Sequence, residues 1–267
     1  MKNQECFDII SPTKKPVPFL LSIPHSGTKF PAEKQILYDK KQVKKLDDTD
    51  WFLEHLYDFA ASLGITTIKA NYHRWLIDLN RDPKNKALYD DGRIITSICP
   101  ETNFLGEKIY IEGCQPSSVE ISKRIEKYFL PYHNKIDELI AAFLKTHKKV
   151  FFWDAHSISR YVPTIQSNPF PDLIIGDNNG LTCQKKLTEI CQKMLGNSNF
   201  DLNYNKPFKG GYLTRSKGNP NKKINAIQLE MSKDLYMNEK TNSYKKNNPN
   251  NIKSLLKDTF KEIIKEL

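Results

Sequence analysis

Short apolar runs alternate with stretches of helical periodicity along most of the chain. Short runs rich in apolar or β-branched residues predict strands at residues 19–23, 65–70, 75–79, 150–153, 173–176 and 224–229. Apolar residues recurring every three or four positions predict helices at residues 50–62, 117–143, 181–195 and 252–267. Gly64 is expected to end the first helix, Ser117 or Ser118 to cap the second, and Pro131 to kink or break it. This alternation predicts an α/β fold, with a mostly parallel mixed sheet flanked by helices on both faces.

Residues 1–267 are predicted to form one domain. The most polar stretches, residues 199–223 and 240–251, are too short and too close to the C-terminus to separate two cores. No run approaches the ~20 apolar residues of a membrane span, and residues 1–18 lack the apolar region of a signal peptide. The five cysteines form no CxxC pair. Together these features predict a cytoplasmic protein with reduced thiols.

The formal net charge of +10 comes mainly from lysines spread along the chain. A basic surface can attract nucleic acid or an anionic substrate, but lysine-rich solvated faces without a partner are commoner. The chain has no nucleic-acid recognition motif, so a small anionic substrate is predicted as the partner, and neither nucleic acid nor membrane. Residues 203–223 carry several basic side chains, among them Lys209, Arg215 and Lys217, and no acidic one. Either an ordered loop beside a negatively charged group or a flexible surface loop fits that composition. Nothing in the sequence specifies an oligomeric state.

Polar residues follow three of the predicted strands. His25, in Pro-His-Ser-Gly, His156, in Asp-Ala-His-Ser, and Glu230 each come just after an apolar run. Ligands gather beyond the carboxyl ends of strands in an open α/β sheet. One such histidine alone is more often a structural residue, but two with a carboxylate offer a metal three ligands and leave a position for water. That is the catalytic arrangement of zinc. Asp154, on the same face of its strand as His156, is expected to hold that ring.

The third metal ligand is predicted to come from the acidic segment 47–50. Asp50 is favoured and Asp48 is the alternative. Either residue could instead cap the helix predicted at 50–62. The two roles are compatible, because a helix N-terminus would also bring the acid into the site.

Several basic side chains are candidates for binding an anion. Arg81 follows Asn80 at the end of a predicted strand, and a guanidinium with an adjacent amide suits a carboxylate. A surface arginine paired with a neighbouring aspartate is the alternative. Arg74 and Arg215 are further candidate anion contacts.

Glu230 is the candidate general base. It lies at the end of an apolar strand, where an unpaired carboxylate is costly. Beside a metal-bound water it could accept a proton. A structural ion pair with a lysine is the alternative.

Several short blocks of the sequence resemble the N-formylglutamate amidohydrolases. In chain order, between about residues 19 and 239, they are PHSG, DTDW, RWLIDLNR, DAHS, GGYLTR and IQLEM followed by LYM. The resemblance implies a hydrolase of the zinc-carboxypeptidase-like (phosphorylase/hydrolase-like) fold. It also implies one zinc ion per chain, or another divalent metal, and cleavage of N-formyl-L-glutamate to formate and L-glutamate in histidine breakdown.

The resemblance also implies roles for individual residues. The implied metal ligands are His25, Asp50 and His156, with Ser26, Asp48 and Asp154 supporting them. The implied substrate contacts are Arg74, Asn80, Arg81, Gly211 and Tyr212. Glu230 would pass a proton from the attacking water to the leaving amine, and Arg74 or Arg215 would stabilise the oxyanion.

Other functions stay open at this point. Asn225 and Ser216-Lys217 stand where the family pattern often has histidine, which leaves room for another N-acyl amino acid as substrate. A metal-dependent amidase or carboxypeptidase acting on peptides is a second possibility. A basic nucleic-acid-binding protein on the same fold, without a metal, is the non-enzymatic one.

Overall fold

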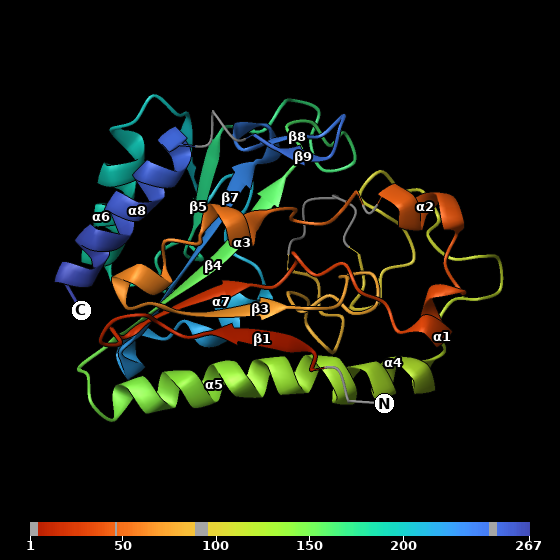
Figure 1. The fold of residues 1–267 in the computed structure, drawn as a ribbon, viewed down its shortest axis with the longest axis horizontal. Coiled ribbons are helices and arrows are strands. Elements are labelled where there is room, and N and C mark those ends of the chain that lie inside the picture. The colour runs from red at the N-terminus through yellow and green to blue at the C-terminus, as the bar shows by residue number, and fades with distance from the viewer. Residues whose placement is uncertain (1–4, 46, 89–95, 246–249) are drawn as a thin grey trace.

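A mixed sheet forms the centre of the protein (Figure 1), whose computed structural model describes residues 5–45, 47–88, 96–245 and 250–267. Within these residues the sheet has seven strands, in the order β1 (Phe7–Ile10), β3 (Thr66–Ala70), β2 (Phe19–Ile23), β4 (Val150–Ile158), β7 (Ile224–Ser232), β5 (Leu173–Gly176) and β6 (Leu202–Tyr204). The four strands β3, β2, β4 and β7 are parallel, whereas β1 and the β5–β6 pair run the other way. A separate hairpin pairs β8 (Met237–Asn238) with β9 (Ser243–Tyr244).

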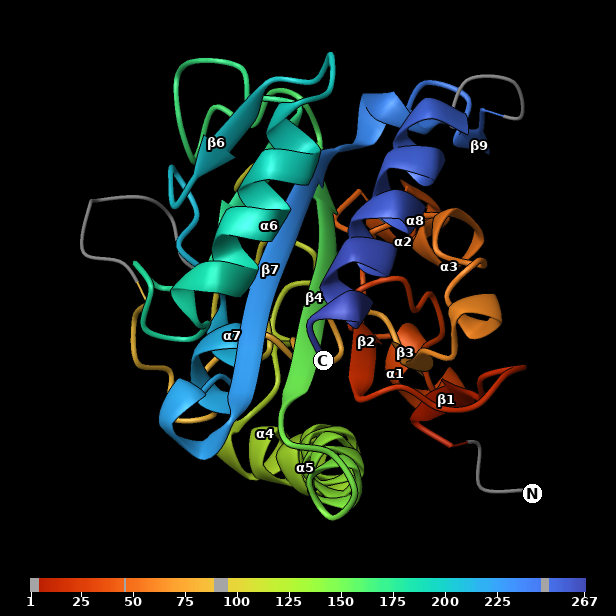
Figure 2. The same cartoon turned by 90° about the vertical axis from the view of Figure 1, so that its left-hand side faces the viewer.

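Helices cover both faces of the sheet, as the sequence predicts. One face carries α6 (Lys185–Gly196) and α8 (Asn250–Lys265), which lie across β7 and β4 in Figure 2, together with α3 (Leu53–Leu56). The other face carries α4 (Ser118–Arg124), α5 (Leu130–Leu144) and α7 (Tyr212–Lys217). Two further short helices, α1 (Ala32–Gln35) and α2 (Lys40–Lys45), lie outside these layers (Figure 1). Among the described helices, none combines the length and the apolar character that a membrane crossing requires.

The core is divided by the sheet because successive side chains of a strand point to opposite faces. Phe151 and Trp153 of β4 pack with Phe260 of α8, while Phe152 between them packs with Ile136 of α5. All nine residues of β4 are buried. The apolar strand expected at residues 150–153 is therefore a central strand covered on both sides.

Most predicted elements are confirmed, but the two strands that carry the chemistry are longer than expected. β2 and β5 have the predicted bounds, whereas β4 continues to Ile158 and β7 continues to Ser232. The ladder between them pairs His156 with Glu230. His156 and Glu230 therefore lie within the last paired residues of the two strands, and not in loops beyond them. β1 and β6, both at the edges of the sheet, were not predicted.

Two predicted elements are wrong. In place of one helix at residues 50–62, the chain forms α3 and a separate 3-10 turn at Ala61–Leu63, because Phe52 takes a left-handed conformation with φ of 63° before α3. Gly64 does end this segment, with φ of 86°. Residues 75–79 form buried turns and no strand, because their backbone contacts loops and not a neighbouring strand.

The long helix predicted at residues 117–143 forms, and Ser117 caps it. Its Oγ accepts a hydrogen bond from the backbone N of Glu120 at 3.3 Å. Pro131 does not break the helix: the turn before it, Ile125–Phe129, widens to a π-helix, and α5 continues from Leu130. Pro131 lies at the start of α5, where the lack of a backbone N–H costs little.

His133 fastens α5 to the buried turn that ends at Leu79. Its Nε2 lies 2.9 Å from the carbonyl O of Leu79, and its ring stacks on Phe129 with centroids 4.0 Å apart. Burial, followed by the nearby charge of Lys217, lowers the pKa of His133 to about 3. The neutral ring is thus part of the folded state.

We expect His133 to make the metal-free protein less stable in acid. Its folded pKa is below its unfolded value, so the stabilisation is complete above about pH 6.5 and decreases as the pH falls below that. Between pH 8 and pH 5, this single group should lower the free energy of unfolding by about 2 kcal/mol. Urea unfolding of the wild type and His133→Gln at both pH values would measure it. Equal losses in the two proteins would contradict the assignment.

Candidate active site

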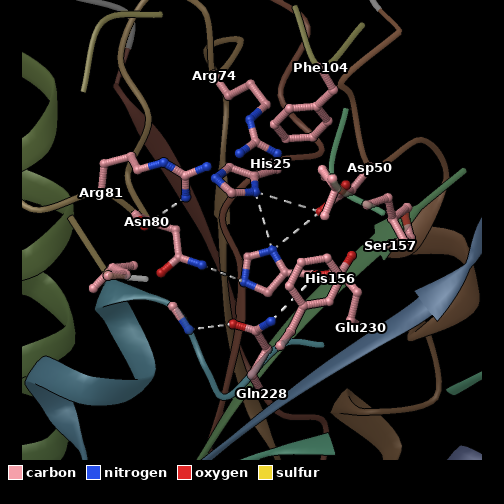
Figure 3. A pocket seen from close by; sticks show the side chains of 15 residues that line it. His25, Asp50, Arg74, Asn80, Arg81, Phe104, His156, Ser157, Gln228 and Glu230 are labelled. Carbon is pink, nitrogen blue, oxygen red and sulfur yellow. Dashed lines mark hydrogen bonds and ion pairs between the residues drawn. The ribbon is translucent and has the colours of Figure 1, made fainter. Parts of the chain in front are cut away.

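Polar residues from three neighbouring strands meet at the carboxyl end of the sheet. His25 follows β2, His156 lies in β4, and Glu230 is its partner in β7. Asp50 reaches them from the loop before α3, and its backbone N donates to the carbonyl O of His25 at 3.0 Å. These four residues line one pocket (Figure 3). The position agrees with the general rule for α/β sheets, in which sites lie outside the carboxyl ends of parallel strands.

Three of these side chains form a triangle of possible metal ligands. The Nδ1 atoms of His25 and His156 are 3.2 Å apart, and Asp50 Oδ2 lies 3.7 Å from the first and 3.4 Å from the second. Ligands of a tetrahedral zinc ion at about 2.1 Å are separated from one another by about 3.4 Å. All three residues are buried, and Asp50 Oδ2 has no hydrogen-bond partner within the described part of the chain. The group can therefore hold a metal ion.

Asp48, the alternative ligand, is used elsewhere. Its Oδ2 accepts from the indole N of Trp75 at 2.7 Å, and its Oδ1 accepts from the backbone N of Phe104 at 3.1 Å. Neither Asp48 nor Asp50 caps α3, whose N-cap is Phe52 without a side-chain hydrogen bond. The capping alternative is thus wrong for both acids, and the geometry favours Asp50 as the ligand.

Carboxylates fix the far side of each imidazole. His25 Nε2 lies 2.8 Å from Asp78 Oδ1, which leaves Nδ1 directed at the triangle. His156 Nε2 lies 3.1 Å from Asp154 Oδ1, as expected from their spacing along the strand, and 3.1 Å from Asn80 Nδ2. A carboxylate behind a metal-binding histidine selects its tautomer and raises its basicity. His25 therefore presents Nδ1 to a cation. His156 does the same when its Nε2 carries the proton and directs it at Asp154, because Nε2 cannot then also accept from Asn80 Nδ2.

The charges around the triangle call for a cation. Burial and then Arg74 lower the pKa of His25 to about 4, so this ring is neutral. Burial alone would lower the pKa of His156 too, but Asp154 and Asp50 outweigh it and raise that pKa to about 10. The buried carboxylates of Asp154 and Asp50 carry negative charge that needs a nearby positive charge. Either a proton on His156 or a metal ion in the triangle can supply it.

Glu230 lies next to the triangle without belonging to it. Burial, with a further contribution from the charge of Asp50, raises the pKa of Glu230 to about 8. Gln228, two residues earlier on β7, has its Nε2 3.4 Å from Glu230 Oε2. Two neighbouring acids in different environments are typical of sites in which one is anionic and the other exchanges protons.

The predicted anion-binding residues are divided between the pocket and its surroundings. Arg74, Asn80 and Arg81 line the pocket. Arg74 donates to Asp78 Oδ2 at 2.6 Å, and Arg81 donates to the carbonyl O and Oγ1 of Thr96 at 3.1 and 3.2 Å. The Asn80 amide contacts protein on both sides: its Oδ1 accepts from the backbone N of Leu213 at 2.7 Å, and its Nδ2 faces His156.

Arg215 and Tyr212 are not brought to the pocket wall. Arg215 donates to the carbonyl O atoms of Gly210 at 2.8 Å and Leu88 at 3.0 Å. Tyr212 packs beside His133, with ring centroids 5.6 Å apart. Of their sequence block, it is Gly211 that lines the pocket.

The basic segment at residues 203–223 contributes to the pocket through uncharged groups. Phe208 and Gly211 line the pocket, while Lys217 pairs with Asp137 at 2.7 Å. Asn225, the other departure from the family pattern, lies at the opposite end of β7 from Glu230 and accepts a hydrogen bond from the backbone N of Gln184 at 2.8 Å. It is therefore remote from the triangle. Ser26 Oγ is buried with no hydrogen-bond partner among the described residues.

The sequence interpretation missed several residues of the site. Asp78 fixes both His25 and Arg74, and Gln228 links Glu230 to Gly211 by accepting from its backbone N at 2.7 Å. The position of Gln228, two residues before Glu230 on one strand face, could have indicated it. The remaining wall residues give no such signal and are Leu88, Phe104, Ser157, Ile158, Ile165 and Phe208.

Comparisons with known proteins give one consistent result. Residues 17–237 match the model of the N-formylglutamate amidohydrolase family. N-formylglutamate deformylases of Pseudomonas aeruginosa and Pseudomonas putida are each 36% identical to the chain, covering 87% and 84% of it and 86% and 83% of their own lengths. A crystal structure of N-formylglutamate amidohydrolase from Ralstonia eutropha superimposes with a TM-score of 0.82 at 25% identity, covering 97% of both chains. A gene product of Agrobacterium tumefaciens shares the fold. Its crystal structure superimposes with a TM-score of 0.74 at 15% identity, covering 97% of this chain and 96% of its own.

Proposed function

The chain belongs to the N-formylglutamate amidohydrolase family, and from this we propose that it hydrolyses N-formyl-L-glutamate to formate and L-glutamate with a zinc ion bound by His25, Asp50 and His156. As a member of this family it is an amide hydrolase, which argues against the alternative of a nucleic-acid-binding protein without enzymatic activity. The observation that carries the metal assignment is the buried triangle, in which Asp50 Oδ2 has no other partner among the described residues. Zinc bound there would supply Lewis acidity for the amide carbonyl and for the attacking water.

Glu230 is the proton carrier of the proposed reaction. It lies beside the triangle on β7, and its raised pKa suits a group that accepts and returns a proton near neutral pH. It takes a proton from the attacking water and gives it to the leaving nitrogen. Its protonated form therefore has a definite role in the second half of the reaction.

Two arginines of the pocket suit an anionic substrate whose amide gains further negative charge during hydrolysis. Arg74 is held against Asp78 beside His25, where its charge can stabilise the oxyanion that develops on the amide. Arg81 lies beside Asn80 and is fixed by Thr96, so it can hold a glutamate carboxylate and orient the amide. Arg215 acts indirectly, by fixing the backbone next to Gly211.

Formate release from N-formyl-L-glutamate tests this function. Purified protein is assayed as isolated, after chelation and after zinc is added back, with cobalt and manganese in parallel. Activity that chelation removes and zinc restores is the expected result. Protein that binds zinc in the triangle and releases no formate would refute the substrate and leave another N-acyl amino acid to be tested.

Gly211→Ala is expected to impair turnover by displacing Asn80. A Cβ at position 211 would lie 2.2 Å from Asn80 Nδ2, so the amide that faces His156 must move. We expect kcat/KM to fall about 100-fold, because small misplacements in an active site have effects of this size. Gly196→Ala is the control, since a Cβ there meets only Leu202 at an ordinary 3.6 Å. Equal kinetics in both variants would show that the Asn80 position is unimportant.

A further inference from the structure

A second cavity adjoins the metal pocket, and the two share a wall. The shared residues are Phe104, Ser157 and Ile158. On the far side, the second cavity is lined by residues that include Trp51, Leu105, Val162, Lys233 and Met237. A molecule bound at the metal triangle is thus separated from this space by a few side chains only.

Phe104 is the largest part of the wall and is fixed from several directions. Its backbone N donates to Asp48 Oδ1 at 3.1 Å, and its carbonyl O accepts a hydrogen bond from Thr164 Oγ1. Its ring lies against the guanidinium of Arg74, with 4.6 Å from the guanidinium carbon to the ring centroid. It also packs against the apolar cluster of Ile158 and Val162. A ring held in this way cannot move aside without breaking contacts.

The wall lies on the side of the triangle opposite the proposed carboxylate contacts. In Figure 3, Asn80 and Arg81 are on one side of the two histidines, while Phe104, Asp50 and Ser157 are on the other. A substrate whose amino-acid carboxylate is bound at Arg81 has its scissile amide at the triangle. Its acyl group then points toward Phe104 and Ser157, because the acyl and amino parts lie on opposite sides of the amide bond.

We propose that Phe104, supported by Ser157, selects the acyl group of the substrate and restricts it to formyl. The inference rests on the proposed function, since it assumes that the amide of an N-acyl amino acid is bound at the triangle. A formyl group presents only a hydrogen to the wall, whereas acetyl and propionyl groups present carbon atoms that a fixed ring excludes. Removing the ring joins the two cavities and makes room for the larger groups.

The test compares acyl groups on one amino acid. Values of kcat/KM for N-formyl-, N-acetyl- and N-propionyl-L-glutamate are measured for the zinc-loaded wild type, Phe104→Ala and Leu105→Ala. The wild type should strongly prefer formyl, and Phe104→Ala should reduce the formyl-to-acetyl ratio at least about 10-fold through faster cleavage of the acetyl compound. Leu105→Ala should keep the wild-type ratio, because Leu105 is 49% exposed and lines the second cavity without the metal pocket.

Two outcomes would overturn the proposal while leaving the proposed function intact. One is a wild type that cleaves the three substrates equally well, and the other is an unchanged ratio in Phe104→Ala. A formyl-to-acetyl ratio that falls only because formyl cleavage slows would also overturn it, because that result would come from a displaced Arg74 and not from a larger acyl site. If Phe104→Ala does not fold, Phe104→Leu decides, because it keeps an apolar group over Arg74 and removes the ring. Failure of the wild type to cleave any of the three would instead refute the proposed function.

Discussion

Replacing Glu230 by glutamine is expected to lower kcat for N-formyl-L-glutamate by about 1000-fold while the zinc content stays at one per chain. Glutamine keeps the size and polarity of the side chain but cannot accept a proton from water. Glu230 lies outside the ligand triangle, so its loss should not release the metal. The fold should also be kept, because Gln228 can hydrogen-bond to an amide at position 230 as it does to the carboxylate.

Steady-state kinetics and elemental analysis of the same preparation measure both parts of this result. Glu266→Gln is the matched control, because it removes a surface carboxylate that pairs with Lys186. A Glu230→Gln enzyme that retains wild-type kcat would exclude Glu230 as the general base. A variant that loses zinc together with activity would instead make Glu230 a ligand.

Asp50→Asn and Asp48→Asn should have opposite consequences, although the two residues are close neighbours in the chain. Asp50→Asn removes the only carboxylate of the triangle, and we expect zinc affinity to fall by at least about 100-fold, with loss of activity. Asp48→Asn should keep the metal and lower the free energy of unfolding by about 1–3 kcal/mol. An amide at position 48 cannot accept from both the indole of Trp75 and the backbone N of Phe104.

Zinc affinity is measured by competition with a chelator, and stability by urea unfolding of the metal-free proteins. Zinc affinity, and not stability, distinguishes the two variants, because Asp50 Oδ2 lies 3.4 Å from Nδ1 of His156 and loss of its charge should also destabilise the metal-free protein. Zinc loss in Asp48→Asn with zinc retained in Asp50→Asn would reverse the assignment of the ligand.

The local pattern of the chain was sufficient for most of the fold. A fully apolar run such as residues 150–153 predicts a buried strand, because a strand covered on both faces buries every side chain. The same reasoning fails where burial comes from loops. Trp75 is buried by contacts with Asp48 and Tyr38, which lie outside the sheet. The residues around it are therefore as apolar as those of a buried strand, although they pair with no other strand.

The sequence by itself determined that two histidines and an acid lie near the ends of parallel strands, since strand order along the chain and residue chemistry are local properties. Which acid completes the triangle was decided by tertiary structure, because Asp48 and Asp50 differ only in the partners that distant loops bring to them. The same holds for Asp78 behind His25 and for Phe104 between the two cavities. Distances between residues far apart in the chain depend on how the loops pack, and no short-range pattern encodes them.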